Sequence, residues 1–184
     1  MRTVKICLAG AAAAAMVGFL AAPAAAAPTD TTTVTFEVLA GTLDIDAPAA
    51  ADLGDGAPGS TITGALGPVT VTDSRGAADA SWAATVTSTV FQTGGGTAAE
   101  TVEPELIDYW SGPATATTGT GTFTPGQAAA VNAAPLSSVT PLPAFTHTGG
   151  TGGNTATWNP TLIVHVPLDS IAGVYTGTVT HSVA

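Results

Sequence analysis

Apolar and polar residues alternate along several short stretches of the chain, most clearly between residues 160 and 184. Two runs in this stretch place every second residue on one apolar face, which is typical of half-buried strands. The apolar positions are Leu162, Val164 and Val166 in the first run, and Tyr175, Val179 and Val183 in the second. The link between them contains Pro167 and Gly173 and cannot continue either strand, so we expect a corner between two sheets or between neighbouring strands. Tyr175 lies where the hydroxyl of a corner tyrosine would bond back to this link.

The first alternating stretch of the chain is residues 31–40, and it also predicts a strand. Its apolar face consists of Val34, Phe36 and Val38. The apolar positions then change parity across Gly41, because Leu43 and Ile45 continue the pattern on odd numbers. A bulge or tight turn at Gly41 would produce this change.

Residues 69–90 predict a hairpin with a wide loop. The first strand contains Val69 and Val71, and Asp73 to Gly76 reads as a turn. The return strand has one apolar face, formed by Trp82, Ala84, Val86 and Val90. Threonines occupy its opposite face, which suits a solvated surface or a ligand platform.

Further short strands are expected near residues 61–65, 106–110 and 155–158. Residues 111–143 are mostly Thr, Gly, Ala and Pro and predict a long excursion with two short strands. No apolar pattern with the 3.6-residue period of an α-helix occurs after the first residues of the chain. We therefore predict an all-β fold, a single Ig-like antiparallel β-sandwich.

The N-terminus is typical of a secretory signal peptide. Arg2 and Lys5 precede an apolar stretch and the small-residue sequence AAPAAAAP. We expect cleavage after Ala26, which gives a signal peptide of residues 1–26 and a β-sandwich domain of residues 27–184. The mature protein would be secreted and would contain no cysteine, since Cys7 is the only one. No later apolar run is long enough to predict a membrane span.

The expected mature chain is strongly acidic. One basic side chain, Arg75, remains against 13 acidic ones, a formal charge of 1 − 13 = −12. Such a surface repels nucleic acid and anionic membranes, so neither is an expected partner.

Four residues are candidates for ligand binding. Tyr109, Trp110 and Trp158 flank loops rich in Gly and Pro, where an aromatic ring could stack on a sugar, although the same rings could equally belong to the core. Arg75, the single cation, predicts either an ion pair with Asp73 within the turn or a contact to a ligand carboxylate. Trp82 and Tyr175 lie on predicted inward faces and are expected in the core.

Metal and catalytic sites receive little support from the sequence. A weak calcium candidate is the aspartate-rich segment with Asp44, Asp46, Asp52 and Asp55, whose spacing fits no EF-hand. A second acidic cluster contains Glu100, Glu103, Glu105 and Asp108. His165 and His181 fall on opposite parities and should diverge, which argues against zinc. No Gly-x-Ser-x-Gly or other catalytic motif occurs, so we expect a non-enzymatic protein without cofactor.

Two blocks of the chain resemble the WxL-type domains of Gram-positive surface proteins. In that family a Val-x-Asp-x-Arg-Gly turn precedes a Gly-Trp-x-Leu strand, and a strand with Tyr, Leu and Trp closes the domain. The matching positions here are Val71, Asp73, Arg75, Gly76 and Trp82, followed by Tyr175 and Val179. Both tryptophan motifs are incomplete, because Ala83 and Ala84 follow Trp82 and His181 replaces the second Trp.

The resemblance implies a secreted cell-surface protein that associates non-covalently with the cell wall, through peptidoglycan or other surface proteins. The alternative expectation is a structural or adhesive subunit that assembles with copies of itself. Its basis is the terminal stretches 31–40 and 175–184, which are rich in Thr and carry no Lys to protect a sheet edge. The sequence leaves the oligomeric state open.

Overall fold

The computed structural model describes residues 28–184, so the expected signal peptide and Cys7 lie outside the described part. The chain divides into two units, one that ends at Phe36 and one that runs from Glu37 to Ala184. In the first unit, residues 28–36 form neither helix nor strand. In residues 28–184, no helix is long and apolar enough to cross a membrane.

All strands belong to the second unit, and the described residues contain no α-helix. Three 3-10 turns connect strands, at Ala98–Glu100, Pro104–Leu106 and Ala130–Asn132. The strands are β1 (Leu43–Asp46), β2 (Thr61–Ala65), β3 (Val69–Asp73), β4 (Trp82–Ser88), β5 (Phe91–Gln92), β6 (Thr101–Val102), β7 (Ile107–Trp110), β8 (Ala114–Thr118), β9 (Thr122–Pro125), β10 (Ala134–Pro135), β11 (Leu142–Thr148), β12 (Asn154–Trp158), β13 (Thr161–His165) and β14 (Val179–Val183).

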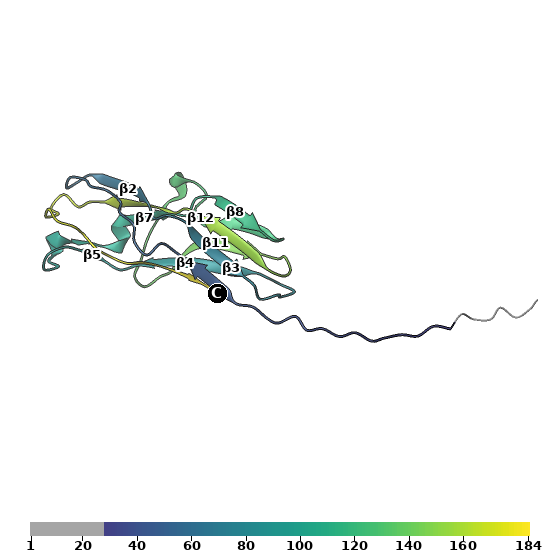
Figure 1. Ribbon diagram of the computed structural model, residues 1–184. Coiled ribbons are helices and arrows are strands. Elements are labelled where there is room, and N and C mark those ends of the chain that lie inside the picture. Colours follow the sequence, from purple (N-terminus) through teal and green to yellow (C-terminus); the bar gives the residue numbers. More distant parts are fainter. Residues whose placement is uncertain (1–27) are drawn as a thin grey trace, which may run out of the picture. The chain divides into compact units, whose positions relative to one another are not determined.

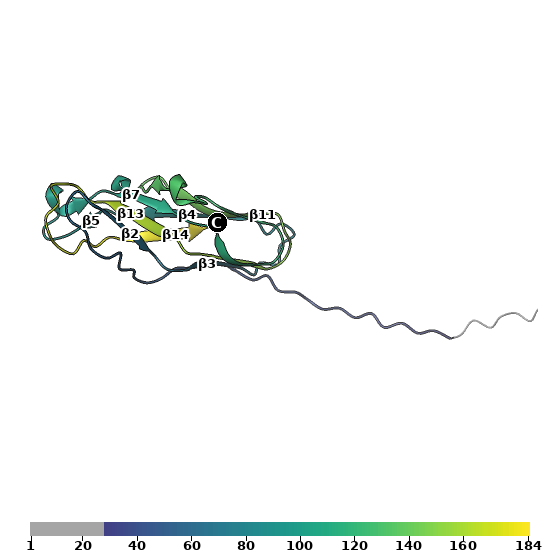
Figure 2. The same cartoon turned by 90° about the horizontal axis from the view of Figure 1, so that it is seen from above.

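The strands form three antiparallel four-stranded sheets and one short pair, β5 with β6 (Figure 1). The first sheet has the order β1-β3-β12-β8, the second β10-β7-β13-β2 and the third β14-β4-β11-β9. β1 lies beside β14 and β8 beside β9, so the first and third sheets meet along both edges. Figure 2 shows the same sheets from above, with β5 toward one end of the sandwich and the β11 label toward the other. The predicted all-β sandwich is confirmed.

The core is built from side chains of all three sheets. Trp158 on β12 stacks on Phe145 of β11, with ring centroids 4.9 Å apart. Tyr109 and Leu162 enter from the second sheet and are fully buried. Fully burying one large apolar side chain contributes roughly 1.5–3 kcal/mol of hydrophobic free energy. These rings therefore hold the three sheets together without a disulfide in the described residues.

The predicted inward faces are confirmed in several strands. Trp82, Ala84 and Val86 are buried on β4, and β2 spans residues 61–65 as predicted. The predicted hairpin is wrong, because β3 belongs to the first sheet and β4 to the third. The turn at Asp73 carries the chain between sheets, where both strands still bury one face.

The closing corner is confirmed as a crossing between sheets. β13 belongs to the second sheet and β14 to the third. The Tyr175 hydroxyl lies 2.8 Å from the carbonyl oxygen of Ile171 and 3.0 Å from that of Ala99. Tyr175 thus fastens the link to the β5–β6 region, as expected for a corner tyrosine.

The strand predicted at residues 31–40 is wrong. None of these residues is in a strand, and the first backbone hydrogen bond to the sandwich joins Gly41 N–H to the carbonyl oxygen of Ser74 at 3.1 Å. The physical reason is that β1 begins only at Leu43, where pairing with Asp73 of β3 starts. The alternating pattern is present, but the described chain offers it no partner strand.

Candidate functional site

The structure places two of the three candidate aromatic residues in the core. Tyr109 and Trp158 are both fully buried, and the Trp158 indole N–H donates to the Tyr109 hydroxyl at 3.1 Å. Burial raises the pKa of Tyr109, so the phenol stays protonated. Neither ring offers a face to a sugar, so the expectation that they bind a ligand is corrected. Trp110, the next residue on β7, is half-buried, and its indole nitrogen has no hydrogen-bond partner in the described residues.

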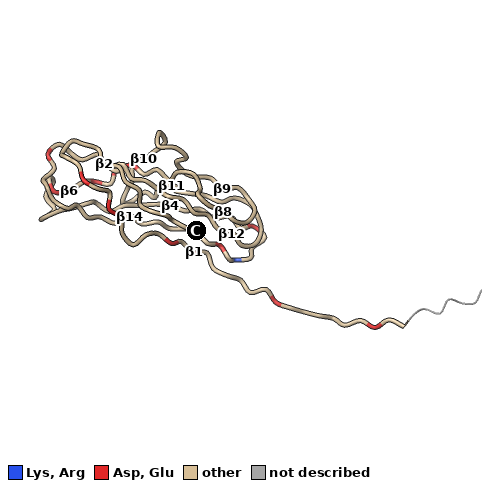
Figure 3. Tube along the Cα trace, turned by 45° about the horizontal axis from the view of Figure 1, so that its top comes forward, with Lys and Arg blue, Asp and Glu red and all other residues tan. Residues whose placement is uncertain are grey.

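Arg75 forms the ion pair that the turn predicted. Its guanidinium contacts Asp73 through Nε at 2.9 Å and Nη2 at 2.8 Å, and Nη2 also donates to the Ser81 carbonyl oxygen at 2.9 Å. The hydrogen bond from Arg75 is the main cause that lowers the pKa of Asp73, and burial opposes it. In the described residues this is the only Arg or Lys among 13 acidic side chains (Figure 3). The Arg75 guanidinium is therefore already hydrogen-bonded to Asp73 and Ser81 within the chain.

The ion pair continues into a buried polar network. Asn154 donates from Nδ2 to Asp73 at 3.3 Å and accepts from the Trp82 indole N–H at 2.8 Å. The network joins β3, β4 and β12, and therefore two of the sheets. Its satisfied partners indicate a structural role.

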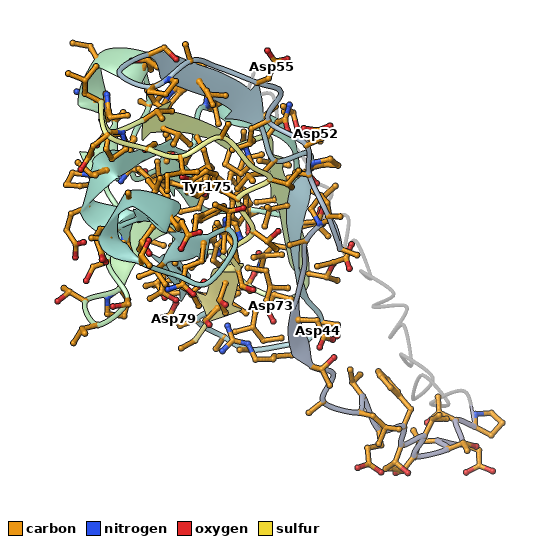
Figure 4. All side chains as sticks on the ribbon, turned by 90° about the vertical axis from the view of Figure 1, so that its left-hand side faces the viewer. Asp44, Asp52, Asp55, Asp73, Asp79 and Tyr175 are labelled. Carbon is orange, nitrogen blue, oxygen red and sulfur yellow. The ribbon has the colours of Figure 1, made fainter. Side chains whose placement is uncertain are left out.

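The four aspartates proposed for calcium do not gather. Asp44 accepts a hydrogen bond from the Thr42 hydroxyl, and Asp52 caps the backbone N–H of Gly54 at 2.9 Å. In Figure 4, Asp52 and Asp55 lie near each other at the top of the view, and Asp44 lies well below them. Across residues 28–184, no three His, Cys, Asp or Glu side chains form a group that could hold a metal ion.

The second acidic cluster is likewise divided among local contacts. Glu100 accepts from the backbone N–H and hydroxyl of Thr97, at 3.0 and 2.8 Å, and these bonds lower its pKa. Asp108 accepts from the ring of His165 at 2.9 Å on the exposed surface of the second sheet. These carboxylates therefore cap and pair locally.

The histidines diverge as predicted. His165 is exposed beside Asp108, whereas His181 on β14 contacts the Tyr109 hydroxyl through Nε2 at 3.1 Å. Burial lowers the pKa of His181 to about 4, so the ring is neutral at pH 7. The third one, His147, is buried between the carbonyl oxygens of Ala80 and Thr120, at 2.8 and 2.9 Å.

An apolar groove opens along one side of the sandwich. Its larger part has a volume of about 620 Å³, and a smaller part of about 180 Å³ shares Leu53, Phe91 and Gly177 with it. The smaller part reaches the fully buried core residues Val69 and Leu162. The apolar lining includes Leu53, Ile62, Phe91, Val164, Val174 and Tyr175.

One wall of this groove is an unpaired backbone edge. Thr176 exchanges both backbone hydrogen bonds with Gln92, at 2.9 and 3.1 Å. Because successive residues of an extended chain point their backbone groups to opposite sides, those of Tyr175 and Gly177 face away from β5. They have no hydrogen-bond partner within residues 28–184. The buried hydroxyl of Ser170, also in the groove, has none either.

Exposed large apolar side chains gather in two places. The first is the N-terminal apolar segment, by which we mean residues 31–40, where Phe36 is 88% exposed. The other exposed members of this segment are Val34, Val38 and Leu39. The second place is the link before β14, with Leu168, Ile171 and Val174 exposed by 83%, 50% and 85%. Two of these three, Ile171 and Val174, line the groove.

Sequence reasoning missed the groove. Its walls come from β2, β5, β13 and two links, which are far apart in the chain. The available signal was the apolar content of the link, since Ile171 and Val174 interrupt a turn-forming stretch.

No protein-family model matches this chain, and searches of curated proteins and of solved structures found no significant match.

Proposed function

We propose that this protein is a secreted, non-enzymatic structural subunit that assembles with copies of itself at the cell surface. The observation that carries the proposal is the N-terminal apolar segment. It has the alternating pattern of a strand, no strand partner in the described residues, and four large apolar side chains exposed by 78–88%.

The chemistry of this segment favours pairing with another chain. An extended strand with free N–H and C=O groups is a template for β-strand addition. Val34, Phe36 and Val38 share one face, so a partner could bury all three at once. Thr33, Thr35 and Glu37 would remain on the solvated face.

Two features support the proposed location: an N-terminal sequence typical of a signal peptide and the resemblance to WxL-type domains. The expected mature chain has a formal charge of 1 − 13 = −12, which favours solubility, so association has to come from the apolar segment. The N-terminal apolar segment carries one charged residue, Glu37, which lies on its polar face.

Sedimentation velocity over a range of protein concentrations tests the proposal. We expect the average mass of the wild-type chain to rise with concentration. Phe36→Asp should weaken association about 10–100-fold, because burying a Phe side chain contributes about 1.5–3 kcal/mol and 1.4 kcal/mol is tenfold.

Thr35→Asp is the matched control, because it adds the same charge one residue away on the opposite face. Association of this variant should stay within about threefold of wild type, since an exposed charge costs little. A wild-type mass that does not change with concentration would contradict the proposal. Equal effects of the two variants would show that the apolar face does not matter.

Association with the cell wall is the second candidate, and Trp110 is the observation that favours it. Trp110 is partly exposed on the second sheet, so its ring could stack on a sugar. Co-sedimentation with peptidoglycan sacculi tests it. A wall-binding protein should lose binding in Trp110→Ala, whereas unchanged pelleting of that variant would exclude Trp110 as the contact.

A further inference from the structure

We propose that the apolar groove of one copy receives the N-terminal apolar segment of a second copy as an added β-strand. This inference rests on the proposed self-assembly and names the surface that accepts the segment. The acceptor is the edge at Tyr175 to Val179, and the floor of the site is the apolar lining between β13 and β5.

The acceptor edge has the hydrogen-bonding groups that an added strand needs. The backbone N–H and C=O of Tyr175 and Gly177 face away from β5 and are unpaired in the described chain. β1 lies beside β14 but pairs with β3, and Ala47 to Ala51, which follow β1, line the groove. The groove is therefore the place where the sandwich lacks a strand.

The faces of the two surfaces match. A strand in the groove would point every second side chain at Phe91, Val164 and the core below them. The N-terminal apolar segment offers Val34, Phe36 and Val38 at that spacing. Its Glu37 would point to solvent, away from the apolar floor, so no charge is buried.

The area is sufficient for a specific contact. The three side chains of that face, Val34, Phe36 and Val38, are 79–88% exposed and offer roughly 300 Å² of apolar area on the segment. The groove would bury a similar area. The side chains and the groove together contribute roughly 600 Å², and the backbone of the added strand brings the total toward the ~1,000 Å² expected of a specific interface.

Chain length favours a second copy over the same copy. Gly41 is fixed beside Ser74 at one end of β1, and Ala47 lines the groove at the other end. The six steps from Gly41 to Ala47 span about 20 Å at roughly 3.3 Å per residue. A chain that turned back from Gly41 would use residues 35–40 to cover this distance, and Phe36 and Val38 could not reach the groove. A second copy has no such limit.

The geometry also sets the type of assembly. Each copy would donate one segment and accept one, through two different surfaces, which is a heterologous contact. Such contacts form open chains unless the rotation between copies closes a ring. We therefore expect a range of oligomers rather than a dimer that ends growth.

Mixing of single-cysteine variants tests the pairing directly. In a Cys7→Ser background, one preparation carries Val38→Cys or Phe36→Cys and the other carries Val174→Cys or Ile171→Cys. All four positions are at least half exposed, so the substitutions should not disturb the fold. A short bis-maleimide linker relaxes the need for one register. We expect cross-linked heterodimers on mixing, and none when Val139→Cys, 84% exposed elsewhere, replaces the groove cysteine.

A charge in the groove provides the second arm. Val174→Asp should weaken association of the full-length chain at least 10-fold in sedimentation velocity, and Val139→Asp should leave it within about threefold. Concentration-dependent mass that persists in Val174→Asp, without a cross-link, would overturn the groove assignment but leave self-assembly intact. A variant that carries both cysteines in one chain separates the two possibilities. If cross-links form within this chain but not between the mixed single-cysteine chains, the groove binds the segment of its own chain and the proposal is overturned. A monomeric wild type would instead contradict the proposed function.

Discussion

Replacing Arg75 by Ala should reveal how much the buried carboxylate of Asp73 depends on its one cation. Asp73 is 2% exposed and receives two hydrogen bonds from the guanidinium, at 2.9 and 2.8 Å. After the substitution it keeps only the backbone N–H of residue 75 at 3.0 Å and the Asn154 amide at 3.3 Å. The charge is then left buried without a counter-ion.

The expected cost follows from the burial of the two partners. Removing one member of a buried ion pair costs about 3–5 kcal/mol. Arg75 is 33% exposed, and solvent screening weakens such a pair, so we expect about 2–4 kcal/mol. A domain of this size has a free energy of unfolding of about 5–15 kcal/mol, so the variant should still fold.

Urea unfolding followed by tryptophan fluorescence measures this cost. At a slope of about 2 kcal/mol per molar urea, the midpoint of Arg75→Ala should fall by about 1–2 M at pH 7. Combining it with Asp73→Asn should recover part of the loss, because the double variant no longer buries an unpaired charge.

The change of the free energy of unfolding with pH tests whether the charge of Asp73 is the cause. Arg75 lowers the pKa of Asp73 in the folded chain below its ordinary value near 3.8. The stabilisation is therefore present above that value and is lost as the pH falls through the folded pKa. The wild type and Arg75→Ala should converge at acidic pH. A midpoint difference that is absent at pH 7, or that persists unchanged in acid, would contradict the role of the charge.

Three further predictions concern other contacts. The pKa of His181 is lowered to about 4 by burial, so its contribution to stability is present above about pH 6.5 and is lost as the pH falls toward 4. In His181→Gln the urea midpoint should therefore depend less on pH between these two values. A pH dependence equal to that of the wild type would refute this prediction. Tyr175→Phe removes the hydroxyl that contacts Ile171 and Ala99, and it should cost about 1–2 kcal/mol in urea unfolding without changing the sheet signal in circular dichroism. Calcium should not shift the melting temperature, because no three acidic side chains in the described residues lie close enough together to hold a metal ion. A calcium-dependent shift that Asp52→Asn abolishes would contradict this prediction.

The burial of strand faces could be predicted from the sequence because alternation reports it directly. Trp82, Ala84 and Val86 share parity and are buried together on β4. Strand partners could not be predicted in the same way. β3 and β4 each bury one face, and the pattern is the same whether they pair in a hairpin or lie in different sheets. An alternation of period two indicates which face of a strand is buried, but it does not indicate which strand lies beside it.

The candidate site was only partly predictable for a related reason. Tyr109 shares parity with the buried Ile107, and that parity indicates the core more strongly than the nearby loop indicates a ligand. The N-terminal apolar segment looked like any other strand, since sequence cannot show whether a partner edge exists. The groove joins residues of several distant elements, so only the folded chain brings Phe91 and Val174 together.

Hydrogen exchange of the backbone amides in residues 33–39 tests the central claim most directly. In dilute protein these amides should exchange as in an unstructured peptide, because the segment has no strand partner in the described chain. At concentrations where the mass has risen, alternate amides should become protected, since every second N–H of an edge strand is hydrogen-bonded. The Val174→Asp variant should stay unprotected at the same concentration, and Val139→Asp should behave as wild type. Assembly with these amides still exchanging freely would contradict the account.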